Sequence, residues 1–255
     1  MNLSMVLEIS TTAIIQARMS SSRFPGKVMS PISGKSMLEI QLERISLCKS
    51  IDEIIIATTV NKCDDVIAEL GKKLSIKVFR GSEADVLSRY VEASKLTNAK
   101  TLVRLTADCP LIDAGIIKKV VDAFKLNNAD YGSNINPPSY PDGLDVEVFS
   151  KEILFLANDL CKEPSKREHV TPWMINNKDI KKINISNSQD LSYLRWTVDY
   201  PEDLELIKNI INKMDSNIEF SWLEILDLQT KDNKIFEINR KHKRNIGSNI
   251  CEGQK

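Results

Sequence analysis

The chain has 255 residues, and its 35 lysines and arginines balance its 35 aspartates and glutamates, so the formal net charge at pH 7 is zero. A protein that binds nucleic acid carries a basic excess, so this balance argues against that class. No stretch approaches the roughly 20 apolar residues of a membrane span, and the five cysteines form no CxxC pair. We therefore expect a soluble, cytoplasmic protein with reduced thiols, whose N-terminal residues lack the basic region of a signal peptide.

Short apolar runs typical of strands alternate with amphipathic segments typical of helices in the first half of the chain. Strands are expected at 13–15, 54–59, 76–79 and 101–107, and helices at 37–49, 83–96 and 113–126. This alternation predicts an α/β protein with a mostly parallel sheet and helices on both faces. Ligands of such sheets lie beyond the carboxyl ends of the strands, where the strand order reverses.

A loop that carries three cations follows the first strand. It contains Arg18, Arg23 and Lys27, and small residues such as Ser20 let its backbone approach a ligand. Cations at the carboxyl end of a strand suit a polyphosphate, although a solvated basic loop is the alternative. The loop is not a P-loop, because the GxxxxGK[ST] spacing is absent.

The pattern changes after about residue 134, where a turn-rich stretch at 136–143 interrupts the alternation. Compact domains usually keep such long loops for function. Further strands are expected at 144–149 and 193–197, and further helices at 150–161, 167–177 and 202–214. From Arg240 onward the sequence is typical of a frayed chain end.

Two aspartates follow predicted strands and precede chain reversals. Asp108 follows the strand 101–107, and Asp199 follows the strand 193–197. Both should lie at the ligand-binding edge, where two carboxylates could hold one Mg²⁺ that keeps water and phosphate as its other ligands. For Asp199, a plain N-cap of the following helix is an equal alternative.

Arg104 lies inside an otherwise apolar strand, on the same side as Asp108. A buried arginine needs an anionic partner, for which either Asp85 or a ligand phosphate would serve. Alternation also places Asp145 and Glu147 on one face of their strand, a pattern that fits an amphipathic strand as well as a substrate pocket.

His169 is one of two histidines and is surrounded by charged residues. A single histidine can be structural or catalytic, and both readings stay open for His169.

Several motifs, in order, resemble those of sugar-activating cytidylyltransferases. The segment AIIQARMSSSRFPGKVM resembles the opening motif of the group that contains 3-deoxy-manno-octulosonate and acylneuraminate cytidylyltransferases. RLTADCPLID, RGSEADVLSRY, DGLDVEVFS and REHVTP resemble the spore-coat-polysaccharide (SpsF-type) branch, and the resemblance spans about residues 12–210. It implies a Rossmann-like, GT-A-like nucleotidyltransferase fold that converts CTP and an acidic sugar into a CMP-sugar and pyrophosphate, with Mg²⁺ and usually as a homodimer.

The resemblance and the residues together give the expected site. The nucleotide-binding set is Arg18, Ser20, Arg23, Lys27, Arg80 and Arg104, of which Arg18 and Lys27, with Asp108, form the catalytic set. The acceptor-binding set is Asp85, Asp145, Glu147 and His169, and the Mg²⁺ ligands are Asp108 and Asp199. Transfer at the α-phosphorus needs positioning and positive charge and no protein nucleophile.

The expected organisation has three parts: an N-terminal extension at 1–11, a nucleotidyltransferase domain at 12–230 and a C-terminal tail at 231–255. Within the domain, 12–133 is the nucleotide-binding half and 134–200 the smaller part for acceptor binding or dimerisation. One alternative is a GT-A-type glycosyltransferase, which the basic loop and the absence of an Asp-x-Asp motif at Asp108 disfavour. Another is a non-catalytic nucleotide-binding protein.

Overall fold

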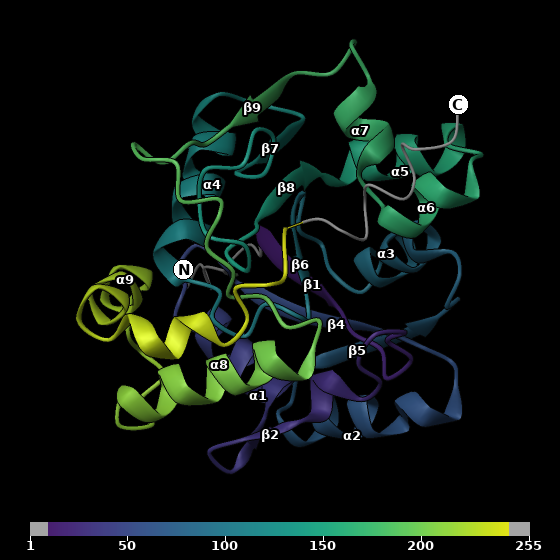
Figure 1. Cartoon of the computed structure of the whole chain (residues 1–255). Coiled ribbons are helices and arrows are strands. Elements are labelled where there is room, and N and C mark those ends of the chain that lie inside the picture. Colours follow the sequence, from purple (N-terminus) through teal and green to yellow (C-terminus); the bar gives the residue numbers. More distant parts are fainter. Residues whose placement is uncertain (1–9, 245–255) are drawn as a thin grey trace, which may run out of the picture.

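The computed structural model describes residues 10–244 (Figure 1). Within this range, seven strands form one sheet in the order β5-β4-β1-β6-β8-β7-β9. Their bounds are β1 (Thr11–Gln16), β4 (Glu53–Thr59), β5 (Lys77–Gly81), β6 (Thr101–Thr106), β7 (Tyr131–Ser133), β8 (Glu147–Ser150) and β9 (Lys182–Asn184). A short hairpin of β2 (Pro31–Ile32) and β3 (Lys35–Ser36) is separate from the sheet.

The sheet is mostly parallel, as the sequence predicts. The central strand β1 runs parallel to β4 and β6, and β4 runs parallel to β5, whereas β8 is antiparallel to both β6 and β7. In the sheet, β4 lies on one side of β1 and β6 lies on the other side. The strand order therefore reverses beside β1. The carboxyl ends of β1 and β6 therefore form the edge at which α/β sheets bind ligands.

Helices cover both faces of the sheet (Figure 1). Their bounds are α1 (Met37–Ser46), α2 (Asp65–Lys73), α3 (Val86–Ser94), α4 (Ala114–Leu126), α5 (Lys151–Leu160), α6 (Pro164–His169), α7 (Pro172–Asn176), α8 (Pro201–Lys213) and α9 (Trp222–Lys231). Among the described residues, three 3₁₀ turns are η1 (Lys27–Met29), η2 (Lys62–Asp64) and η3 (Asn233–Glu237). None of the helices in residues 10–244 is long and apolar enough to cross a membrane.

Strand alternation divides the buried residues between the two faces. Ala13 and Ile15 of β1 pack into a cluster with α1, α2, α4 and α8, while Ile14 packs into a second cluster with α3, α5 and α7. Because both faces are covered, the centre of β1 is apolar at 13–15, which is why this stretch is a continuous hydrophobic run in the sequence.

Four expected elements differ in the structure. The segment 193–197 is not a strand; its one bridge joins Asp142 to Arg195, because the segment runs beyond the end of β6. The strand expected at 144–149 begins only at Glu147. The tail is not frayed at 240–244, because Arg244 donates hydrogen bonds to Asp145 and to the carbonyl of Tyr140.

The helix expected at 167–177 is interrupted at Val170. This residue has φ 68° and ψ −58°, and the N–H of Thr171 donates to the carbonyl of His169 at 2.8 Å, which is the geometry of a γ-turn. Pro172 starts the next helix, at a position where its missing N–H costs no hydrogen bond. A positive φ is strained for a β-branched residue, so this turn is held by its surroundings: the Val170 side chain is completely buried.

Candidate active site

A cavity opens beyond the carboxyl ends of β1 and β6. The predicted residues that line it are Arg18, Arg23, Lys27, Asp108, His169 and Asp199. The loop after β1 folds over the strand end because the N–H of Gly26 donates to the carbonyl of Met19 at 2.8 Å. Gly26 has φ 76°, a conformation that favours glycine, and it directs the following Lys27 inward.

Lys27 lies between the two predicted aspartates. Its Nζ is 2.9 Å from Asp199 Oδ1 and 3.6 Å from Asp108 Oδ2, and it donates to the carbonyl of Val198 at 2.6 Å. Burial lowers the pKa of the Lys27 ammonium, but the charges of Asp108 and Asp199 outweigh burial and raise it above its usual value. Lys27 is therefore a fixed positive charge at neutral pH.

Asp199 is surrounded by three cations. Its Oδ1 accepts from Lys27 and lies 2.6 Å from Arg23 Nη2, while its Oδ2 accepts from Arg195 Nη2 at 3.1 Å. Burial raises the pKa of this carboxyl, but the charges and hydrogen bonds of Lys27 and Arg23 hold it well below its ordinary range. Asp199 is therefore ionised throughout the neutral range.

The alternative role of Asp199 as an N-cap is wrong. The N-cap of α8 is Tyr200, and the acceptor for its free backbone groups is the Asp203 carboxylate. Asp203 Oδ2 accepts from the N–H groups of Asp199 and Tyr200 at 2.9 and 3.0 Å. Asp203 thus caps the helix, and the Asp199 side chain is left for the cavity.

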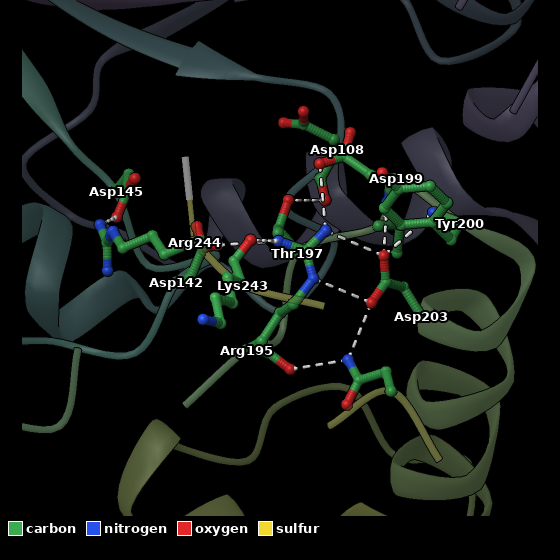
Figure 2. Close-up of polar contacts among 12 residues, drawn as sticks. Asp108, Asp142, Asp145, Arg195, Thr197, Asp199, Tyr200, Asp203, Lys243 and Arg244 are labelled. Atoms are coloured by element: carbon green, nitrogen blue, oxygen red, sulfur yellow. Dashed lines mark hydrogen bonds and ion pairs between the residues drawn. The ribbon is translucent and has the colours of Figure 1, made fainter. Parts of the chain in front are cut away.

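Backbone contacts join Asp108 to the Asp199 segment (Figure 2). The carbonyl of Asp108 accepts from the N–H of Val198 at 2.8 Å and from the hydroxyl of Thr197 at 3.1 Å. The structure thus brings together the two carboxylates, although 90 residues separate them in the chain.

The two carboxylates fit a divalent cation that is shared with a ligand. Asp108 is 30% exposed at its side chain and presents oxygen donors, as Mg²⁺ requires. In residues 10–244, no group of three or more His, Cys, Asp or Glu side chains could hold an ion by itself. The arrangement suits a cation that completes its shell with phosphate and water.

Arg18 is a partly exposed cation of the loop. Its guanidinium lies 3.6 Å from Glu83 and 4.0 Å from Glu168, and its side chain is 37% exposed. Ser20 donates its hydroxyl to Glu83 as well. Long, exposed ion pairs of this kind are weak, so an incoming phosphate could displace them.

Arg80 does not line the cavity. Its guanidinium donates to the carbonyls of Thr59 and Asn61 at 2.9 and 2.8 Å and pairs with Asp65 at 2.7 Å. All three nitrogens of Arg80 are therefore engaged by the loop after β4. Its expected contact with the nucleotide stays a prediction.

The anionic partner of Arg104 is Glu147, so Asp85, one of the two partners considered from the sequence, is wrong, and contact with a ligand phosphate stays a prediction. Arg104 and Glu147 are directly opposite each other in β6 and β8 and form a buried ion pair. Glu147 also accepts from the hydroxyl of Tyr131 at 2.7 Å. Asp85 instead caps α3 and accepts from Arg167 at 2.8 and 3.0 Å.

The structure does not bring the acceptor-binding set together around the cavity. His169 lines the cavity at the C-terminal end of α6, beside Glu168. Asp145 is paired with Arg244 at 2.5 Å, and Glu147 and Asp85 are paired with arginines. Their roles toward an acceptor stay predictions.

Sequence reasoning missed Arg195, a buried residue that connects Asp199 to Asp142 and Asp203 (Figure 2). The sequence carries a signal for it, because Arg195 interrupts the apolar run LRWTV as Arg104 interrupts its own strand. It missed Arg244 because that residue lies in a segment that looks like a frayed end.

The fold and the site define a nucleotidyltransferase: a strand-order reversal, a basic loop and two carboxylates meet at one cavity. Residues 12–241 match the family model described as cytidylyltransferase, and the chain belongs to this family of CTP-dependent enzymes. The resemblance noted in the sequence is thereby confirmed, and the glycosyltransferase alternative is not favoured.

Similar proteins cover nearly the whole chain. An uncharacterized protein of Methanocaldococcus jannaschii is 38% identical over 89% of this chain and 93% of its own length. The spore coat polysaccharide biosynthesis protein SpsF of Bacillus subtilis is 30% identical over 86% of this chain and 93% of its own. A solved cytidylyltransferase from Leptospira borgpetersenii has a TM-score of 0.86 and 34% identity, covering 90% of this chain and 97% of its own.

A more distant structure shares the fold. The CMP:2-keto-3-deoxy-manno-octonic acid synthetase, solved in complex with CTP, has a TM-score of 0.60 and 18% identity, covering 80% of this chain and 99% of its own. This likeness confirms the expected nucleotidyltransferase architecture.

Proposed function

We propose that this chain transfers the cytidylyl group of CTP to an acidic sugar or a related small acid, and so supplies a CMP-sugar for surface polysaccharide. The similar proteins named for spore coat polysaccharide and for 2-keto-3-deoxy-manno-octonic acid support this acceptor class. The observation that carries the proposal is the position of Lys27, whose Nζ is held between Asp108 and Asp199 at the cavity.

The proposed reaction is an in-line displacement. A hydroxyl oxygen of the acceptor forms a bond to the α-phosphorus of CTP, the bond from this phosphorus to the pyrophosphate oxygen breaks, and the hydroxyl proton passes to water. Lys27, Arg18 and Arg23 come from one loop and would bind the triphosphate, so that their charges offset the negative charge on the leaving pyrophosphate. Ser20, Arg80 and Arg104 are the further candidates for nucleotide contacts, and His169 is the candidate that faces the acceptor.

We also propose that Asp108 and Asp199 hold Mg²⁺ when CTP is bound. The ion would neutralise phosphate charge and polarise the α-phosphate. Lys27 and Arg23, which contact Asp199 in the structure, would contact the phosphates from their present positions, because both line the same cavity.

The cellular setting is proposed as a homodimer in the cytoplasm. Four cysteines in residues 10–244 are free thiols, which supports a reducing compartment. Light scattering should give about twice the chain mass of 28.8 kDa. A mass equal to a single chain at micromolar concentration would contradict the homodimer.

One assay tests the proposed activity. The protein is incubated with each nucleoside triphosphate, Mg²⁺ and a panel of sugar acids, and pyrophosphate is measured. We expect release that depends on CTP and on one acid of the panel. Comparable turnover with ATP and the same acid would contradict the CTP preference, and CTP binding without release for any acid would favour a non-catalytic nucleotide-binding protein.

A further inference from the structure

Arg195 is a buried arginine that reaches three carboxylates. Its side chain is 6% exposed; its Nη2 is 3.1 Å from Asp199 Oδ2, its Nη1 is 3.1 Å from Asp142 Oδ2, and its Nε and Nη2 are each 3.0 Å from Asp203 (Figure 2). The guanidinium is planar, so a paired contact with Asp203 fixes the direction in which it meets Asp199.

The C-terminal segment locks this arrangement. Asn239, which is 3% exposed, donates its side-chain N–H groups to Asp203 Oδ1 at 2.8 Å and to the backbone carbonyl of Arg195 at 3.1 Å. Asp203 is itself completely buried. Neither the carboxylate nor the guanidinium can therefore rotate without breaking several hydrogen bonds.

The contact with Arg195 gives the two carboxylate oxygens of Asp199 different surroundings. Oδ2 is turned toward the protein interior by Arg195, and Oδ1 is left on the side of Lys27 and Arg23, which line the cavity. Hydrogen bonds of this kind orient the groups that bind a metal and commonly set its affinity.

Stability alone is a poor explanation for this cluster. Asp142, Asp199 and Asp203 bring three carboxylates to one guanidinium, and a buried ion pair adds little net stability because desolvation offsets the attraction. Arrangements that cost stability and lie beside a cavity are commonly kept for function.

We propose that Arg195 is a positioning residue, which orients the Asp199 carboxylate for the cation that accompanies CTP, and that Asn239 holds Arg195 in place. This inference rests on the proposed function, because it takes Asp199 as a cation ligand. It assigns a role in the active site to the segment around Asn239, which lies outside the sheet.

The test is Arg195→Lys, which keeps the charge but cannot contact Asp199 and Asp203 with one planar group. Mn²⁺ serves as the probe, and its binding to the protein with CTP is followed by electron paramagnetic resonance without any acceptor. We expect Mn²⁺ affinity to fall about 10- to 100-fold. CTP affinity without a divalent cation, measured by calorimetry, should be unchanged. An unchanged Mn²⁺ affinity would overturn the inference.

Arg44→Lys is the matched control. Arg44 is 2% exposed, donates to the backbone carbonyls of Leu111 and Ile112, and does not line the cavity. Its replacement should lower the melting temperature and leave Mn²⁺ affinity at the wild-type value. An equal loss of Mn²⁺ affinity in Arg44→Lys would show that general destabilisation is sufficient, and would overturn the role of Arg195.

Asn239→Ala gives a second measurement with a smaller change, in case Arg195→Lys does not fold. It should weaken Mn²⁺ binding in the same direction by a smaller factor, and a wild-type affinity would again overturn the inference. The wild-type titration distinguishes failure of the inference from failure of the proposed function. If the wild-type protein binds no Mn²⁺ with CTP, the proposed cation site does not exist, and the inference fails with it.

Discussion

Lys27 and Asp199 hold each other in place before any substrate arrives. Asp199 keeps Lys27 charged inside a mostly buried position, and Lys27 keeps Asp199 ionised. A charge that is already oriented costs no reorganisation in the reaction, which is the main source of electrostatic catalysis. These two side chains should therefore matter more for kcat than for the binding of CTP.

Lys27→Ala should lower kcat on the order of a hundredfold or more, because it removes a preorganised charge from the transition state. The measurement is steady-state pyrophosphate release at saturating CTP. Lys35→Ala is the control, since the Lys35 side chain in β3 is 44% exposed and pairs with Glu43 in α1. A near-wild-type kcat/KM in Lys27→Ala would show that Lys27 does not act on the triphosphate.

Asp142 should make stability depend on pH. Burial and the nearby Asp145 charge, against the opposing charges of Arg244 and Arg195, raise the pKa of Asp142 from its ordinary 3.8 to about 7. Between these values the folded protein holds a proton that the unfolded chain has released, so stability is present at low pH and is lost as pH rises toward about 7.

The measurement is the free energy of urea unfolding at several pH values from about 4 to 8. One pKa unit corresponds to about 1.4 kcal/mol, so Asp142 contributes a loss of up to about 4 kcal/mol across this range. Asp142→Asn keeps an oxygen for Arg195 and should flatten the curve by that amount. Parallel curves for the two proteins would contradict the raised pKa.

At the scale of elements, the sequence predicts the strands that helices cover on both faces and the helices that pack against them. The strands β1, β4 and β6 contain apolar runs at 13–15, 54–57 and 102–105, the last interrupted by Arg104, and α1 and α4 have one apolar side, so periodicity is sufficient to find them. The segment 193–197 shows the limit of this reasoning. It buries Trp196 and Thr197 as a strand would, yet it lies where no neighbouring strand remains to pair with it.

In the site, too, the residues with a local sequence signal can be predicted, and the contacts between distant segments cannot. Asp108 and Asp199 could be found because each follows an apolar run at a chain reversal, which is a local signal. The contacts of Arg244 with Asp145, and of Arg195 with Asp142, join segments 99 and 53 residues apart. Such contacts depend on how elements dock, which a single sequence does not contain.

Gly143 tests how tightly the 136–143 loop fits the Asp199 segment. It has φ 109°, and a Cβ there would lie 2.7 Å from the backbone of Trp196 and Thr197. Gly143→Ala should therefore cost about 3 kcal/mol or more of unfolding free energy, by chemical denaturation, because both strain and overlap with backbone arise.

Gly34→Ala separates these two effects. Gly34 also has a positive φ, 84°, but nothing lies within 4 Å of its added Cβ. It should lose only about 1 kcal/mol from strain. Equal losses for Gly34→Ala and Gly143→Ala would mean that the loop can move away from Trp196 at no cost.

The α6–α7 element should act on the acceptor. The γ-turn at Val170 interrupts the helix directly after His169, which lines the cavity. His169→Ala should raise the KM of the acceptor or lower kcat, while CTP affinity by calorimetry stays near the wild-type value. Weakened CTP binding with unchanged acceptor kinetics would place His169 at the nucleotide instead.

At the scale of the whole molecule, the site joins segments that are distant along the chain. The basic loop and Asp108 come from the first half, Asp199 comes from the segment before α8, and Asn239 holds that segment from the C-terminal side. A tail boundary near 231 is therefore a poor place to truncate the protein, because removal of 239–244 would release Asp203 and Arg195.

Asp108 and Asp199 reach the cavity from distant parts of the chain. If Asp108 and Asp199 bind one cation together, Asp108→Asn and Asp199→Asn should each reduce kcat severely, and the double variant should be little worse than either, because residues that act as a unit are not additive. The measurement is a double-mutant cycle in kcat with Mg²⁺ titrated for each variant. Losses that multiply would show independent roles. An Asp199→Asn protein that loses stability but keeps wild-type kcat and Mg²⁺ dependence would leave Asp108 and the nucleotide as the cation's only ligands.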